Sequence, residues 1–311
     1  MTHDYHIPVL LDEVIRLIDP KPGGIYIDCT VGGGGHTEGM ALRMAGEGLI
    51  LGIDRDPEAI NAAEIRLASF GKMVRLRRAP FSRLKELARG EGVAAAHGIL
   101  FDFGISSAQI DEASRGMSYR TDAPLDLRMD PTRGESASDL ITRLSEAEIA
   151  QLLRLYGDEP RARAIARAIA RARRRPQTTR ELAALVSRVA PRPPEKTLSR
   201  VFQAFRIAVN RELEEIESAL PAAVDLLAPQ GTIVTIAYHS LEDSIAKDFL
   251  RNEAKGCVCP PSLPVCLCGH TPRVELVTRR AVRPTEEEVR RNRRSRSARL
   301  RAARRLPRAV A

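Results

Sequence analysis

The residues best suited to chemistry form a glycine-rich segment from Asp28 to His36, with the sequence Asp-Cys-Thr-Val-Gly-Gly-Gly-Gly-His. The segment follows a short apolar run and precedes a helical pattern, so we expect a turn between a strand and a helix. Glycine permits positive φ and lets a ligand approach the backbone, because it has no Cβ. The following helix would add free N–H groups and a positive dipole end. The segment therefore predicts a binding site for a small, charged cofactor.

An acidic residue at the end of the next apolar run supports this prediction. Asp54 lies 22 residues after Gly32, and a carboxylate there can accept hydrogen bonds from both hydroxyls of a ribose. These features fit NAD as well as S-adenosylmethionine. The dinucleotide motif, however, needs a glycine at the helix start, where this sequence has His36, and Asp28 would repel a pyrophosphate but could hold an ammonium. S-adenosylmethionine is therefore favoured over a nucleotide and over a loop without a ligand.

Two further positions follow later apolar runs. Phe81 could cover an adenine ring, although a lone phenylalanine is more often a core residue. Asp102 ends the fourth run, at the carboxyl edge where open α/β sheets bind ligands. Both residues are candidates for the same cofactor site.

Alternating strand and helix patterns must position these residues. Such alternation implies right-handed crossovers and a parallel sheet with helices on both faces. The expected fold class is therefore α/β, a doubly wound, Rossmann-like sheet. Strands are expected at 25–29, 49–54, 73–76 and 98–103, and helices at 37–44 and 59–67.

The pattern changes after Phe103, which indicates an insertion. A loop is expected over 105–135, and capping boxes at Ser145 and Thr178 begin helices. Strands return at 232–238 and 274–277. We thus expect a helical insertion domain between strands four and five, with the domains 1–107 (first part of the sheet domain), 108–210 (insertion) and 211–311 (second part).

The net charge of +9 is concentrated in two segments. Residues 279–311 hold 13 Arg and 3 Glu, and residues 151–180 hold 9 Arg and 2 acidic residues, so the remainder is acidic. This asymmetry favours nucleic acid as a partner, with solvated arginine-rich helix faces as the alternative. The last 20 residues are low in complexity, and we expect them to be partly disordered on their own.

Five cysteines are too few for a disulfide scaffold. Four of them form two Cys-x-Cys pairs, Cys257/Cys259 and Cys266/Cys268. Such pairs are less specific for zinc than Cys-x-x-Cys, so zinc, an iron–sulfur centre and four reduced thiols all stay open. No metal is assigned to the cofactor site. With no secretory signal and no apolar run of membrane-spanning length, the expected location is the cytoplasm.

Taken together, these motifs resemble the RsmH/MraW family of bacterial enzymes, the 16S ribosomal RNA cytosine-N4 methyltransferases. The matching segments span residues 6 to about 300. They include His6–Leu11, Gly32–His36, Gly52–Pro57, Asp102–Ser107, Arg115–Ser118, Pro124–Asp130, Phe202–Ile207 and Tyr238–Asp243.

The resemblance implies S-adenosylmethionine as the cofactor and small-subunit ribosomal RNA as the partner. Because of their charge, the Arg161–Arg175 stretch of the helical insertion and the basic tail are the expected phosphate contacts, so we expect the insertion to be the substrate-binding domain. The implied cofactor contacts are Gly34, Gly35 and His36 at the methionine end, Asp54 at the ribose, and Phe81, Asp102 and Gln109 around the adenine and the sulfonium side.

Methylation of cytosine N4 requires activation of a weakly nucleophilic amine, because its lone pair is delocalised into the ring. Alignment and hydrogen-bond acceptors on the N–H groups would supply it. We expect Asp102 to be the orienting acceptor and His239 to be a candidate proton acceptor. A structural role for His239 stays open, as does loss of the proton to water.

Three other functions remain as alternatives. One is methylation of a protein or small-molecule amine, another is RNA binding without catalysis, and the third is NAD-dependent oxidoreduction. The sequence also leaves open whether the protein is a monomer or a dimer.

Overall fold

A computed structural model describes residues 8–259, 265 and 267–307. The chain divides into two compact units, which we call the sheet unit (1–104 and 213–311) and the helical unit (105–212). The helical unit begins three residues before the expected insertion of 108–210 and ends two residues after it. Among the described residues, no helix is long and apolar enough to cross a membrane.

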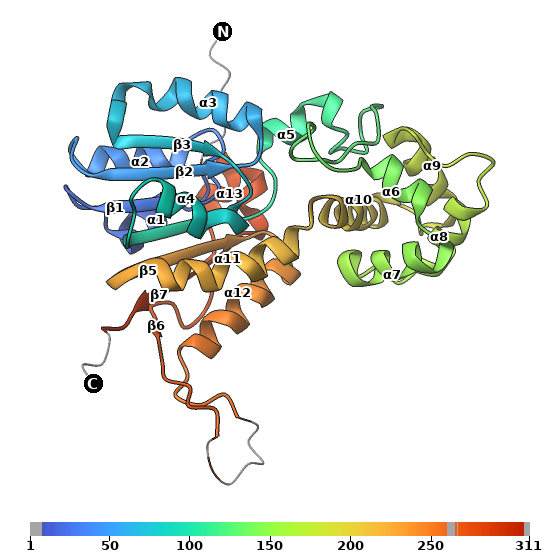
Figure 1. Ribbon diagram of the computed structural model, residues 1–311. Helices are drawn as coiled ribbons and strands as arrows, with labels where there is room; N and C mark the ends of the chain where they lie inside the picture. Colours follow the sequence, from blue (N-terminus) through green and yellow to red (C-terminus); the bar gives the residue numbers. More distant parts are fainter. Residues whose placement is uncertain (1–7, 260–264, 266, 308–311) are drawn as a thin grey trace. The chain divides into compact units, whose positions relative to one another are not determined.

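The sheet unit is built on seven strands in the order β3-β2-β1-β4-β5-β7-β6, which confirms the expected α/β fold (Figure 1). Neighbouring strands from β3 to β5 are parallel, whereas β7 runs antiparallel to both of its neighbours. The strand bounds are β1 Ile25–Asp28, β2 Leu49–Asp54, β3 Val74–Arg78, β4 Ala96–Asp102, β5 Leu227–Ala237, β6 Val274–Leu276 and β7 Arg299–Arg305.

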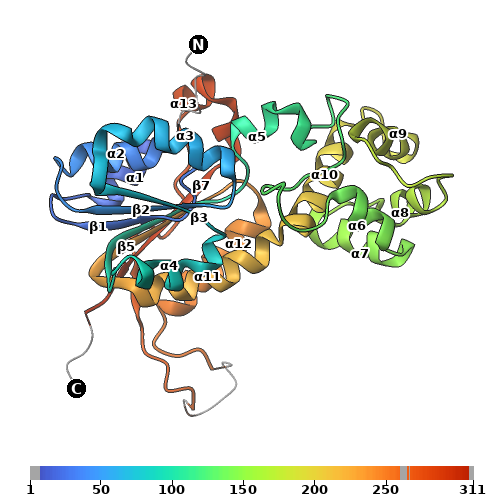
Figure 2. The same cartoon turned by 45° about the horizontal axis from the view of Figure 1, so that its top comes forward.

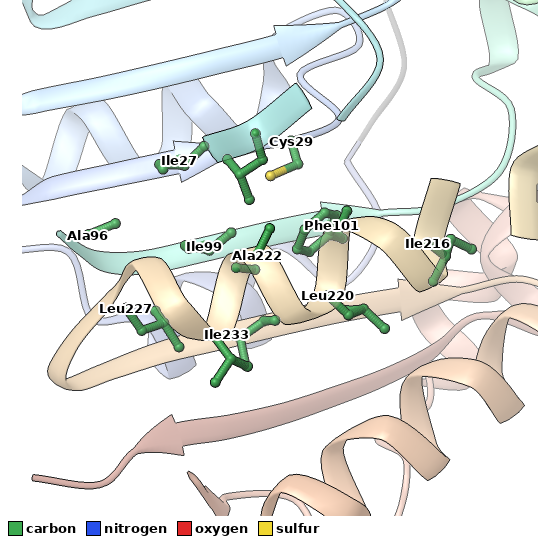
Figure 3. Close-up of a cluster of buried hydrophobic side chains, with 14 of the residues drawn as sticks. Ile27, Cys29, Ala96, Ile99, Phe101, Ile216, Leu220, Ala222, Leu227 and Ile233 are labelled. Carbon is green, nitrogen blue, oxygen red and sulfur yellow. The ribbon is translucent and has the colours of Figure 1, made fainter. Parts of the chain in front are cut away.

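Helices cover both faces of this sheet, because its central strands are apolar on both sides. Strand β4 sends Ile99 and Phe101 into the core beneath α4, α11 and α12 (Figure 3), and Leu100 into the core beneath α1 and α2. The helices of this part of the chain are α1 Leu11–Ile18, α2 Gly35–Arg43, α3 Pro57–Leu67, α4 Leu84–Gly90, α11 Glu212–Leu226, α12 Ser240–Glu253 and α13 Glu286–Arg291.

In the full chain, part of the basic tail forms strand β7 of the sheet. Leu300 and Ala302 are buried in one core and Ala303 in the opposite one, so the segment alternates as a strand does. Arg301 Nε donates to Asp243 Oδ1 at 2.7 Å, and Arg299 Nη1 to Asp243 Oδ2 at 3.2 Å. The arginines that made the tail look unstructured therefore stabilise its place in the sheet. Residues 308–311 lie outside the described part.

The helical unit has its own apolar core, formed chiefly by α7, α8, α9 and α10. Ser145 makes the expected capping box with Glu148. Thr178 also caps its helix, but the Glu181 carboxylate accepts from the Gln177 N–H instead of that of Thr178. The helices are α5 Ser107–Asp111, α6 Ala137–Arg143, α7 Glu146–Gly157, α8 Ala162–Ala170, α9 Thr179–Val189 and α10 Glu195–Asn210. Helix α5 lies within the expected loop of 105–135.

Candidate active site at the carboxyl edge of the sheet

The glycine turn joins the end of β1 to the start of α2, as expected. Gly32 and Gly34 have φ of 50° and 83°, in the left-handed region that favours glycine. A Cβ on Gly34 would lie 3.0 Å from Leu67 Cδ1, and one on Gly35 would lie 3.1 Å from Pro8 Cγ. The first N–H groups of α2 lack acceptors within the helix. The turn therefore presents N–H donors at the carboxyl edge of the sheet.

Asp28 lies in the core beneath the glycine turn, binds residues of the turn and of α2, and does not face a ligand. Its side chain is fully buried, and its carboxylate accepts from Thr30 N at 3.2 Å and from Thr37 Oγ1 at 2.7 Å. Burial raises the pKa of Asp28 to about 6, against the lowering effect of these two hydrogen bonds. The expectation that Asp28 could hold an ammonium is therefore wrong, because no oxygen of it is exposed.

Asp54 connects the end of β2 to the same turn. Oδ2 accepts from Gly32 N and Oδ1 from Asp56 N, each at 2.9 Å. Burial raises the pKa of Asp54 to about 6, although these hydrogen bonds lower it. Each carboxylate oxygen can accept a second hydrogen bond. Asp54 thus shapes the turn and retains acceptor capacity for the hydroxyls of a ribose.

Asp102 ends β4 and is only 15% exposed. Its Oδ1 accepts from the Tyr238 hydroxyl at 2.8 Å, and its backbone N–H donates to Thr30 Oγ1 at 2.6 Å. Burial raises the pKa of Asp102 to about 8; the Tyr238 hydrogen bond lowers it, and the charges of Asp28 and Glu242 add to the rise. The carboxyl group is therefore held rigidly and is close to its pKa near neutral pH.

His36 lies beside Asp102, so the structure brings these two predicted residues together. His36 Nδ1 is 3.8 Å from Asp102 Oδ2, and Nε2 is 3.0 Å from the Val9 carbonyl oxygen. Because a carbonyl only accepts, Nε2 carries a hydrogen. This contact fixes the imidazole, which is buried.

His239 is the candidate proton acceptor for which the sequence also leaves a structural role open, and it lies at the start of α12. It is the N-cap of α12, with Nδ1 accepting from Glu242 N at 3.5 Å and Nε2 lying 3.0 Å from Glu242 Oε1. Glu242 is fully buried, and its Oε2 accepts from Tyr238 N at 2.9 Å. Nδ1 is thus engaged at the helix start, which favours a positioning role, whereas among the described residues the buried Nε2 has no hydrogen-bond partner.

Phe81 and Gln109 complete the predicted set. Phe81 follows β3, where its half-buried ring packs edge-on against Phe101, with 5.7 Å between the ring centroids. Gln109 lies on α5 in the helical unit, where its Oε1 accepts from Ser106 N at 3.0 Å. The other six predicted cofactor contacts belong to the sheet unit.

Tyr238 was missed as a site residue by sequence reasoning. Its hydroxyl holds Asp102, and its backbone N–H donates to Glu242. Its position at the end of a predicted strand could have indicated a site residue. The sequence alone, however, does not show that β5 lies next to β4, which follows only from the strand order.

The charge of this edge identifies the kind of ligand that fits. Within the described ranges, no Lys or Arg forms an ion pair with Asp54 or Asp102, the two carboxylates that face this edge. A pyrophosphate would be repelled, whereas a cationic sulfonium or ammonium would supply the missing partner. The doubly wound sheet, the glycine turn and these carboxylates define a methyltransferase that uses S-adenosylmethionine.

Comparison with known proteins identifies the family. The chain matches the model of the MraW methylase family over residues 3–306. Ribosomal RNA small subunit methyltransferase H of Thermomicrobium roseum is 48% identical, over 97% of this chain and 94% of its own length. The protein of the same name from Heliobacterium modesticaldum is 45% identical, over 97% of this chain and 99% of its own length. The chain belongs to the MraW methylase family.

Proposed function

We propose that this protein transfers a methyl group from S-adenosylmethionine to N4 of a cytosine in the RNA of the small ribosomal subunit. The observation that carries the proposal is Asp102, a rigidly held carboxyl group at the end of β4, beside the cofactor turn. The names of the relatives, which describe small-subunit ribosomal RNA methyltransferases, agree with this substrate. The location is proposed to be the cytoplasm.

Asp102 would activate the amine by accepting a hydrogen bond from it. Tyr238 occupies Oδ1, which leaves Oδ2 to receive an N–H of the base. Such an acceptor localises the amine lone pair and stabilises the positive charge that develops on nitrogen. The bound cofactor supplies an electrophilic methyl group, and the site aligns the amine with it.

The proton released after transfer also has an acceptor. A carboxylate with a pKa of about 8 can take a proton near neutral pH, since a general base works best when its pKa is close to the ambient pH. His239 is assigned to positioning through its capping contacts with Glu242. Water then receives the proton from Asp102.

The helical unit is proposed to bind the RNA. Helix α8 buries Ile165 and Ile169 and exposes Arg163 on its other side. Arg171 and Arg173 are exposed just after this helix, and among the described residues these three arginines form no ion pair. Such side chains are suited to phosphate contacts. Phe, Trp and Tyr make up only 4% of the chain, which favours a folded RNA surface over stacking on a bare strand.

The test uses purified protein, methyl-labelled S-adenosylmethionine and small ribosomal subunits from cells that lack this enzyme. We expect label in N4-methylcytidine after digestion of the RNA. Asp102→Asn should lower kcat by roughly 10²-fold or more. Asp248→Asn, on the exposed side of α12, is the matched control and should leave kcat unchanged.

Two results would contradict the proposal. One is label that appears in ribosomal proteins or an added amine but not in RNA, which would favour the alternative substrate class. The other is equal turnover by the wild-type protein and Asp102→Asn.

A further inference from the structure

The segment between α12 and β6 belongs to no part of the site described above. Four of the five cysteines of the chain lie in it. Its described parts run out from the end of α12 and back to β6, away from the sheet (Figures 1 and 2). A role for these cysteines must therefore come from the segment itself.

Three of its thiols converge. The Sγ atoms of Cys257, Cys259 and Cys268 all lie within 4.8 Å of one another. The Sγ atoms of Cys257 and Cys268 are 3.8 Å apart, whereas a disulfide requires about 2.05 Å. Zinc–thiolate bonds of about 2.3 Å place the corners of a tetrahedron about 3.8 Å apart, and two thiolates on one ion can never be more than about 4.6 Å apart. The measured spacing of Cys257 and Cys268 fits a single ion, and the 4.8 Å bound on the pairs with Cys259 lies close to that limit.

Backbone donors are arranged to favour the thiolate form. Cys259 N donates to Cys257 Sγ at 3.4 Å, and His270 N donates to Cys268 Sγ at 3.5 Å. Both are contacts from residue i+2 to residue i, so the same turn occurs on each side of the segment. In the second turn Gly269 has a φ of 58°, which few other residues adopt. Hydrogen bonds to sulfur stabilise its charged form, which is the form that binds metals.

Apolar packing does not account for this convergence. The side chains of Val258, Val265 and Leu267 are 44%, 67% and 79% exposed. The base of the segment is held instead by polar contacts: Arg273 N donates to the Glu253 carbonyl at 2.8 Å, and His270 Nε2 lies 3.0 Å from the Asn252 carbonyl. The described residues of this segment form no apolar core of their own, and such a segment is the kind that a structural metal stabilises.

We propose that Cys257, Cys259 and Cys268 bind one structural zinc ion that fastens the segment between α12 and β6. Thiolates are typical ligands of structural zinc, and each thiol that binds the ion loses its proton. A structural zinc takes four ligands. Cys266 lies outside the described residues, so the fourth ligand is identified by experiment.

The test is the metal content of the full-length protein, purified under reducing conditions without chelator and supplied with zinc during expression. We expect about one zinc per chain. Cys257→Ser and Cys268→Ser should each lose most of the bound zinc. Cys29→Ala is the matched control, because Cys29 is the remaining cysteine and lies in the core of the sheet unit, and it should retain the metal. Circular dichroism verifies that each variant is folded.

Cobalt replacement and mass measurements complete the test. The cobalt form should show the sulfur-to-metal charge-transfer band of a tetrahedral thiolate site, and Cys257→Ser should abolish it. Loss of zinc in Cys266→Ser would identify the fourth thiolate, and retention would support three thiolates with a water. A folded protein that takes up no zinc or cobalt would overturn the proposal, as would zinc that is unaffected by Cys257→Ser, or a native mass that shows a disulfide.

Discussion

The affinity for S-adenosylmethionine should depend steeply on pH because of Asp102. Its carboxyl group is 15% exposed, and burial raises its pKa to about 8. A cationic ligand interacts favourably with the ionised carboxylate and not with the neutral acid. The cofactor therefore favours the deprotonated form, and its affinity should increase as the pH rises toward 8.

The magnitude follows from the fraction of Asp102 that is ionised. With a pKa of about 8, that fraction is about 1% at pH 6, about 10% at pH 7 and about half at pH 8. If the cofactor binds only the ionised form, Kd should fall about 50-fold between pH 6 and pH 8. The step from pH 6 to pH 7 corresponds to roughly 1.4 kcal/mol of binding free energy. Asp54, with a pKa of about 6, adds about a factor of two over the same range.

The assay is calorimetric titration at pH 6, 7 and 8 at constant ionic strength. Asp102→Asn should remove most of the pH dependence, which also corrects for any titration of the cofactor itself. Asp248→Asn should retain it. S-adenosylhomocysteine, which lacks the sulfonium charge, should show a weaker dependence. A wild-type Kd that changes less than about twofold between pH 6 and pH 8 would refute the reasoning, as would a full dependence in Asp102→Asn.

Three further predictions concern the RNA, the tail and the fold. Raising salt from about 50 to about 200 mM should weaken RNA binding on the order of 10³-fold in filter assays, while cofactor Kd stays nearly constant; equal sensitivity would contradict the assignment. Asp243→Asn removes the partner of Arg299 and Arg301, and should lower the free energy of unfolding in urea by about 2 kcal/mol; no change would show that β7 does not need this contact. Without cofactor, Tm should fall as pH rises from 5 to 8. The pKa values of Asp54 and Asp102 are raised in the folded protein, so their protonated forms stabilise it. That stability is lost as the pH rises through the folded pKa of Asp54, about 6, and of Asp102, about 8. A Tm that rises over this range would contradict that sign.

The sheet could be predicted from the sequence because the hydrophobic pattern of its parallel strands is clear. Residues 25–28, 49–54 and 96–102 are apolar on both faces, as expected for parallel strands between helices. Strand β7 was missed because arginine alternates with its buried Leu300 and Ala302, and a high charge hides a strand pattern. Only the partner Asp243, 56 residues from Arg299, shows why arginine is tolerated there.

The site was predictable where position along a strand determines position in space. Asp54 and Asp102 end parallel strands, so the strand order alone places them at one edge. The direction of a side chain is not determined in this way. Asp28 turns inward toward Thr37, and Tyr238 reaches across from β5 to Asp102. Both contacts depend on packing between elements that are distant in sequence.

The most direct test of the central claim is mass mapping of small-subunit RNA from cells that lack this protein. The RNA should be one methyl group lighter at a single cytosine, and a plasmid that encodes the wild-type protein should restore the methyl group. A plasmid that encodes Asp102→Asn should not restore it. RNA of unchanged mass in the deletion strain, or full restoration by Asp102→Asn, would contradict the account.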